Sequence, residues 1–259
     1  MSGPRIVTLD IETAPMQSYH WGLWDQNIGL EQIIEDWCII SFAAKWLDSK
    51  DIIQYDTGGR GASKVRDDLA VMKQLWKVLD EADIVITQNG KAFDIKKINT
   101  RMLMLGLPPY SPIKVIDTRQ IAKKTFAFSS TKLAWLSKTT KTKKDEHKNF
   151  PGFTLWAECL KDNPKAWEEM RKYNIVDILA TEQLYLSLRS WADNQPSLSV
   201  YDEKTDTQCP KCSSFNVKEN GHDYTNAGKF KRYKCVSCGG HSRSKVNLLS
   251  VSKKKSINK

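Results

Sequence analysis

The chain has 259 residues and a net charge of +10, from 40 Lys and Arg against 30 Asp and Glu. This length supports one full hydrophobic core and a small appended unit. No apolar run approaches the roughly 18 residues of a transmembrane helix, and the first residues lack the apolar stretch of a signal peptide. We therefore expect a cytoplasmic protein without a membrane partner.

The spacing of apolar residues predicts strands and helices in an α/β order. The predicted strands lie near residues 5–11, 37–46, 51–56, 83–87 and 113–118, and the predicted helices lie near 63–81, near 93–105 and over most of 119–190. The basic, poorly periodic segment 137–153 predicts a loop, which either contacts a substrate backbone or is only a solvated connection.

The first predicted strand carries two acidic residues, Asp10 and Glu12, in the segment VTLDIETAP. Residues two apart on a strand point to the same face, so these carboxylates project together. Two adjacent carboxylates repel each other unless a cation lies between them, and hard oxygen ligands suit Mg²⁺ or Mn²⁺. The alternative is a pair of solvated acids at the end of a strand.

A third acidic residue, Asp94, follows the strand near 83–87 and the turn signal Asn89-Gly90. It lies near the start of the next predicted helix, which is where α/β sheets present functional groups. The alternative is that Asp94 only interacts favourably with the helix dipole.

Tyr173 and Asp177 lie four residues apart in a segment with helical spacing, so they share one helix face. An Asp within a rather apolar helix is costly unless it is paired or bound to a metal. The alternative is a surface Asp beside a packed Tyr.

These three motifs, D-x-E, N-x-x-x-F-D and Y-x-x-x-D in this order, resemble those of the DEDD exonucleases of the ribonuclease H-like superfamily. The tyrosine variant matches, because the histidine variant would place a His where Lys172 stands. The segments DIET and NGKAFD are similar to motifs in the proofreading exonuclease domain of family B DNA polymerases and its stand-alone relatives. The resemblance covers residues 5–190. Gln88 departs from the pattern, since relatives often carry His or Tyr there. The resemblance implies an α/β fold with a ribonuclease H-like mixed five-stranded sheet flanked by helices.

The resemblance also implies a site for phosphodiester hydrolysis with two Mg²⁺ or Mn²⁺ ions about 4 Å apart. Asp10, Glu12 and Asp177 would hold the ion that activates the attacking water. Asp10 would also bridge to the second ion, which Asp94 would support largely through its waters. Tyr173 would orient the water nucleophile. Contacts to the terminal nucleotide are expected from the residues Asn89, Phe93 and Thr13, with Phe93 equally compatible with the core.

The predicted activity is a 3′→5′ exonuclease that takes single-stranded DNA ends and releases nucleoside 5′-monophosphates. The alternatives are an exoribonuclease with the same type of site, a non-catalytic nucleic-acid-binding adaptor and an endonuclease of the same superfamily. The presence of all four carboxylates and the tyrosine argues against the adaptor, and the Y-x-x-x-D spacing argues against the endonuclease. A partner DNA polymerase or another replication or repair protein is compatible with this reading, as is a phage-encoded protein in the host cytoplasm.

Four cysteines near the C-terminus form two C-x₂-C pairs, a spacing that predicts a zinc ribbon with one structural Zn²⁺ and a small β-hairpin between the pairs. They are Cys209, Cys212, Cys235 and Cys238. Two disulfides would need an oxidising compartment, and a redox pair would not need a second copy. His222 and His241 are available as other ligands, whereas Cys38 and Cys159 are predicted to be ordinary buried thiols.

Charge and composition divide the chain into a predicted exonuclease domain (1–195), a linker (196–206), the zinc ribbon (207–246) and a basic tail (247–259). From residue 196 onward, 13 Lys and Arg stand against 5 Asp and Glu, which accounts for most of the positive charge of the chain. Basic residues interleaved with aromatic ones favour nucleic-acid binding by the ribbon over protein docking. The tail is equally compatible with a solubilising role.

Overall fold

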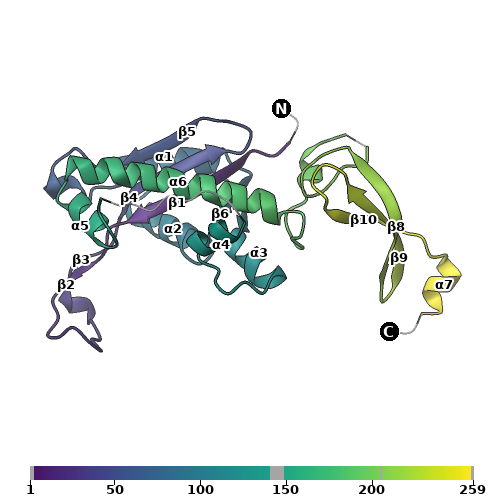
Figure 1. The fold of residues 1–259 in the computed structure, drawn as a ribbon, viewed down its shortest axis with the longest axis horizontal. Helices are drawn as coiled ribbons and strands as arrows, with labels where there is room; N and C mark the ends of the chain where they lie inside the picture. Colours follow the sequence, from purple (N-terminus) through teal and green to yellow (C-terminus); the bar gives the residue numbers. More distant parts are fainter. Residues whose placement is uncertain (1–2, 141–148, 205, 258–259) are drawn as a thin grey trace. The chain divides into compact units, whose positions relative to one another are not determined.

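The computed structural model describes residues 3–140, 149–204 and 206–257 (Figure 1). The chain divides into two compact units, one of Arg5–Tyr185 and the other of Leu186–Lys259 with Met1–Pro4. The boundary between the units therefore lies between residues 185 and 186, before the predicted domain end at residue 195. The predicted roles of the segments on either side stay predictions. Among the described helices, none combines the length and apolar character needed to cross a bilayer.

The larger unit contains a mixed five-stranded sheet, which confirms the predicted fold class. Its strand order is β5-β4-β1-β6-β7. β4 is antiparallel to both β1 and β5, whereas β6 is parallel to both β1 and β7. The strands are β1 (Ile6–Thr13), β4 (Ile39–Trp46), β5 (Ile52–Asp56), β6 (Ile84–Thr87) and β7 (Lys114–Asp117).

Helices cover the sheet, and α6 crosses in front of it in Figure 1. Alternate residues of β1, Val7, Leu9 and Ile11, pack in one core cluster with residues such as Leu75 of α1 and Ile98 of α2. The residues between them therefore point to the opposite face. The helices are α1 (Leu69–Asp80), α2 (Asp94–Met104), α3 (Thr118–Thr125), α4 (Leu133–Thr139), α5 (Thr154–Leu160) and α6 (Pro164–Leu188).

Two predicted elements have different bounds in the structure. The helix expected from residue 63 begins only at Leu69, because Asp68 at its N-cap points into the protein and accepts hydrogen bonds there. A short 3-10 turn, Ala62–Lys64, precedes it. The loop expected over 137–153 starts later than predicted, because α4 continues to Thr139, and residues 141–148 of that loop lie outside the described residues.

A segment between β1 and β4 forms structure that the apolar pattern did not predict. It contains the short strands β2 (Gln17–Ser18) and β3 (Ile33–Glu35) and a 3-10 turn at Leu30–Gln32. Two of its three tryptophans, Trp21 and Trp24, are exposed. Aromatic residues usually signal a core, and here they lie on the surface.

The smaller unit is built on a three-stranded antiparallel sheet in the order β10-β9-β8. β8 (Val217–Thr225) and β9 (Gly228–Cys235) form the hairpin predicted between the cysteine pairs, and β10 (His241–Asn247) adds a third strand. The remaining elements are a 3-10 turn at Leu198–Tyr201, within the predicted linker, and the short helix α7 (Val251–Lys255).

Candidate functional site

The two acidic residues of β1 lie on the face of the sheet that α6 covers. Glu12 is 9% exposed and lies opposite Ser41 of β4, and Asp10 is half-buried. Their neighbours Leu9 and Ile11 pack into the core on the other face. The period of the strand therefore directs both carboxylates away from the apolar layer, as the sequence predicted.

Tyr173 and Asp177 lie one turn apart on α6, and a side-chain hydrogen bond joins them. Burial raises the pKa of the Tyr173 hydroxyl far above its usual value of 10.0, and the charges of Asp177, Glu12 and Asp10 raise it further. Three carboxylates therefore lie near enough to the Tyr173 hydroxyl to disfavour its ionised form. The ring of Trp156 packs edge-on against the Tyr173 ring, with 5.9 Å between the ring centroids, and restricts its position.

Asn174, the residue after Tyr173, orients Asp10. Its Nδ2 donates to Asp10 Oδ2 at 2.8 Å, and its Oδ1 accepts a hydrogen bond from the Ser41 hydroxyl at 2.9 Å. Because Asn174 is fully buried, its amide is stable there only with such partners. The sequence motifs did not single out Asn174. The sequence did contain one indication of its role, an amide side chain next to Tyr173 in a segment with the apolar spacing of a helix.

A buried ion pair sets the register of α6 against β4. Lys45 Nζ donates to both carboxylate oxygens of Glu182, at 2.9 and 2.7 Å. The strand from Ser41 to Lys45 spans about 13 Å at about 3.3 Å per residue, and the helix from Asn174 to Glu182 spans about 12 Å at about 1.5 Å per residue. Because these lengths agree, both polar contacts form together at one position of the helix.

Asp94 is the first residue of α2 and is 4% exposed. Its Oδ1 accepts the backbone N–H of Ile11, between Asp10 and Glu12, at 3.4 Å. Burial raises the pKa of Asp94 from 3.8 to about 7, against the opposing effect of two backbone N–H donors and with a smaller contribution from Asp117. A nearby cation would favour the ionised form of this carboxyl group.

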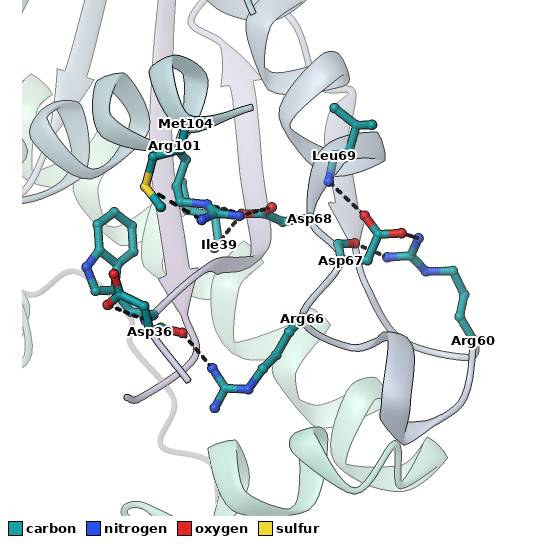
Figure 2. A network of polar contacts seen from close by, with 10 residues as sticks. Asp36, Ile39, Arg60, Arg66, Asp67, Asp68, Leu69, Arg101 and Met104 are labelled. Carbon is teal, nitrogen blue, oxygen red and sulfur yellow. Dashed lines mark hydrogen bonds and ion pairs between the residues drawn. The ribbon is translucent and has the colours of Figure 1, made fainter. Parts of the chain in front are cut away.

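A second ion pair anchors α2 about two turns after Asp94. Arg101 donates from Nε and Nη2 to Asp68, at 2.8 and 2.6 Å, and Asp68 also accepts the N–H of Ile39 at 3.0 Å (Figure 2). Because Ile39 begins β4 and Asp68 precedes α1, one carboxylate joins three elements. This contact fixes where α2 presents Asp94 to β1, and no motif in the sequence predicted it.

The residues predicted to contact the nucleotide lie between β6 and α2 and at the end of β1. Asn89 adopts a φ of +72°, and its side-chain oxygen accepts a hydrogen bond from Arg119 at 2.6 Å. Asp117 at the end of β7 accepts the N–H of Asn89 at 3.0 Å and so holds this loop in place. Phe93 is 39% exposed and lies outside the core, and Thr13 ends β1. Contact between these residues and substrate stays a prediction.

Three of the predicted carboxylates lie near Tyr173 and the fourth, Asp94, contacts the backbone of β1, but their oxygens do not form a tight coordination shell. In the described part of the chain, only the C-terminal cysteines bring three or more candidate ligand atoms within 4.8 Å of one another. Carboxylates repel each other without a cation between them. Two of these carboxylates also accept hydrogen bonds from the protein, Asp10 from Asn174 and Asp94 from the Ile11 N–H. A set of four carboxylates, three of them buried, suits a hard divalent cation.

The four C-terminal cysteines form a separate cluster in the smaller unit. The Sγ atoms of Cys209 and Cys238 lie 3.6 Å apart, and those of Cys212 and Cys235 lie 3.7 Å apart. Sulfurs in a tetrahedral zinc site are about 3.8 Å apart, given Zn–S bonds of about 2.3 Å. Burial raises the pKa of Cys209 to about 11, whereas for Cys235 hydrogen bonds outweigh burial and lower the pKa to about 7. The sulfur spacing fits one zinc ion.

The other two cysteines, Cys38 and Cys159, are buried free thiols, as predicted. Burial raises their pKa values to about 11 and about 12. A thiol that stays protonated is a poor nucleophile and a poor metal ligand, so these side chains act as core residues.

Comparisons with known proteins agree with this fold. A family profile described as the RNase H superfamily matches residues 34–189, a segment that includes Asp94, Tyr173 and Asp177 and begins after β1. No curated protein matches the chain. Among solved structures, the family B DNA polymerase from the hyperthermophilic archaeon Pyrobaculum calidifontis is similar, with a TM-score of 0.53 and 15% identity. The match covers 73% of this chain and 25% of the polymerase chain, and the likeness concerns the fold alone.

Proposed function

The chain belongs to the RNase H superfamily, and we propose that it is a metal-dependent 3′→5′ exonuclease. Its substrates would be single-stranded DNA ends, and its products nucleoside 5′-monophosphates. The observation that carries this proposal is the contact between the acidic strand β1 and the helix of Tyr173 and Asp177, where Asn174 of α6 donates to the Asp10 carboxylate at 2.8 Å. The direction of cleavage and the preference for DNA rest on the motif resemblance.

The acidic residues would act as ligands for two Mg²⁺ or Mn²⁺ ions. When bound, these ions would stabilise charge on the phosphate and lower the pKa of a water molecule. Asn174 orients the Asp10 carboxylate through the 2.8 Å hydrogen bond. The Ile11 N–H holds Asp94 against β1. These contacts position the ligands before substrate binds, which reduces the cost of ordering them during the reaction.

Tyr173 would position the attacking water without acting as a base. Burial and the neighbouring carboxylates raise its pKa well above 10.0, so the hydroxyl stays protonated at neutral pH. A protonated hydroxyl both donates and accepts hydrogen bonds. It would hold the water in line with the phosphate, while the Trp156 ring limits movement of the tyrosine.

The proposal is tested by cleavage of matched single-stranded DNA and RNA, each labelled at its 5′ end, in Mg²⁺ or Mn²⁺. We expect the wild type to produce a ladder that shortens from the 3′ end. Asp10→Ala should produce none while still binding the oligonucleotide in Ca²⁺, and Asp193→Ala, at an exposed acidic residue, should cleave like the wild type. Cleavage by Asp10→Ala at the wild-type rate would contradict the proposed site. Faster cleavage of RNA would identify an exoribonuclease instead.

A further inference from the structure

The register of the C-terminal sheet assigns the paired residues of its strands to one of two faces, and it shifts between Glu219 and His222 on β8 and between Arg243 and Asn247 on β10. In an antiparallel sheet, residues directly opposite each other share a face, and so do residues two apart along one strand. The structure describes all of residues 217–247, so both faces can be followed through β8, β9 and β10.

One face carries a concentration of positive charge. Lys218, Lys234 and His241 form one row across the three strands. Arg232 and Arg243 lie opposite each other in the next row. All five side chains are exposed. With Phe230, two residues from Arg232 on β9, they make up a surface that we call the basic face: Lys218, Phe230, Arg232, Lys234, His241 and Arg243.

The basic face contains two pairs of like charges that stand directly opposite each other, Lys218 with Lys234 and Arg232 with Arg243. Like charges in this arrangement destabilise a sheet. Within residues 217–247, the only carboxylate on this face is Asp223, which lies 3.5 Å from Arg243. Within the three strands, the basic face therefore carries more positive than negative charge.

The opposite face of the same sheet is compensated. Lys231 Nζ on β9 lies 3.0 Å from a carboxylate oxygen of Glu219 on the neighbouring strand β8. Lys229 Nζ lies 6.0 Å from the centre of the Tyr224 ring. Among the residues that the register pairs, this compensated face carries two lysines and one carboxylate, whereas the basic face carries four Lys and Arg and one carboxylate, so the surplus positive charge of the sheet collects on the basic face.

An aromatic ring lies within the basic face. The guanidinium carbon of Arg243 is 4.4 Å from the centre of the Phe230 ring. A guanidinium group that stacks on a ring still presents N–H donors at its edge, and these match the geometry of a phosphate. Basic residues beside flat groups on which bases stack are the composition of single-strand binding surfaces.

We propose that the basic face binds the phosphate backbone of single-stranded nucleic acid. A phosphate backbone would bring negative charge to both like-charged pairs, and thereby turn an unfavourable arrangement into a favourable one. The inference rests on the proposed exonuclease function, for which this face would be a second, non-catalytic contact with the substrate strand.

The test compares two double variants of the full chain that lose the same charge from opposite faces of one sheet. Lys218→Gln with Lys234→Gln changes the basic face, and Lys229→Gln with Lys231→Gln changes the compensated face. Binding of a fluorescent oligothymidylate is measured by anisotropy in Ca²⁺, between about 50 and 200 mM salt. Zinc content and melting temperature are measured for both variants, so that loss of folding is recognised.

We expect the basic-face variant to bind more weakly than the wild type. A plot of the logarithm of its binding constant against the logarithm of the salt concentration should have a slope shallower by about 1.4, because each lost phosphate contact on a single strand contributes about 0.7. Over that salt range, wild-type affinity should then fall about sevenfold more than the variant's. The melting temperature should not fall, since a like-charge pair is removed. The compensated-face variant should bind like the wild type.

Equal loss of affinity in both variants, or no loss in the basic-face variant, would overturn the inference. Cleavage of thymidylyl-thymidine, which has a single phosphodiester bond, is measured in parallel as a readout of the proposed catalytic site. A wild type that binds through the basic face but cleaves no substrate would refute the proposed exonuclease and support the inference about this face.

Discussion

The pKa of Asp94 leads to a prediction about stability that needs no substrate. Asp94 is almost fully buried at the start of α2, where burial raises its pKa from 3.8 to about 7. Asn at this position keeps the shape of the side chain and an oxygen that can accept the Ile11 N–H, and it removes the titration. We expect Asp94→Asn to be more stable than the wild type at about pH 8 when divalent cations other than zinc are absent.

The direction of this stability difference follows from the number of protons bound in the folded and unfolded states. The unfolded carboxyl group loses its proton near 3.8, whereas the folded one keeps it up to about 7. Between these values the folded state binds more protons, so the free energy of unfolding of the wild type falls as pH rises and then levels off above about 7. At about 1.36 kcal/mol per pH unit, the advantage of Asp94→Asn reaches at most about 4 kcal/mol.

Urea unfolding, followed by tryptophan fluorescence between about pH 5 and 8, measures this difference. Asp193→Asn makes the same chemical change at an exposed position and should unfold like the wild type at every pH. Adding Mg²⁺ at about pH 8 should stabilise the wild type and have little effect on Asp94→Asn, since a bound cation offsets the buried charge. If wild type and Asp94→Asn unfold alike across the whole range, the reasoning about burial is wrong.

Four other changes have defined outcomes. Asn174→Ala removes the amide that orients the Asp10 carboxylate, and steady-state kinetics should show turnover reduced roughly 10–100-fold. Normal turnover would contradict this role of Asn174. Tyr173→Phe should slow single-turnover cleavage and leave oligonucleotide binding in Ca²⁺ unchanged; an unaltered rate would exclude a role in orienting water. Cys209→Ser should lose stoichiometric zinc, measured by atomic absorption after dialysis, and retention of one zinc per chain would contradict the metal assignment. Lys45→Met leaves the Glu182 carboxylate buried without its cation, so the free energy of unfolding should fall by about 3–5 kcal/mol in urea. The double variant Lys45→Met with Glu182→Leu should recover most of that loss, and failure to recover would show that the ion pair itself is not the cause.

The sheet could be predicted from the sequence because its strands are short apolar runs between turn signals. The prediction near 83–87 is close to β6, Ile84–Thr87, which is buried along its whole length. The motif residues on β1 and α6 could likewise be placed on shared faces from their spacing of two and four. Local periodicity therefore determined the elements and the direction of their functional side chains, though not the distances between them.

The contacts that hold the site together could not be predicted, because they join residues far apart in the chain. Asn174 meets Asp10 across 164 positions, and Arg101 meets Asp68 across 33. A buried Asn or Asp looks the same in the sequence as an exposed one, and only the tertiary register shows which donor it meets. The N-terminus of α1 was predicted too early for the same reason, since Asp68 serves a long-range contact there.

The buried polar contacts of α6 have a consequence for how the site is maintained. Burying carboxylates near one another destabilises the fold until a cation is bound, and a buried ion pair such as Lys45–Glu182 adds little net stability to offset this. Such pairs do restrict where the helix can lie. A shift of α6 by one residue, about 1.5 Å, would separate Asn174 from Ser41 and Glu182 from its lysine together, and each buried group left unpaired would cost about 1–3 kcal/mol or more. The helix therefore has one position in which Asn174 and Glu182 both keep their partners, and in that position Tyr173 lies near the carboxylates of β1.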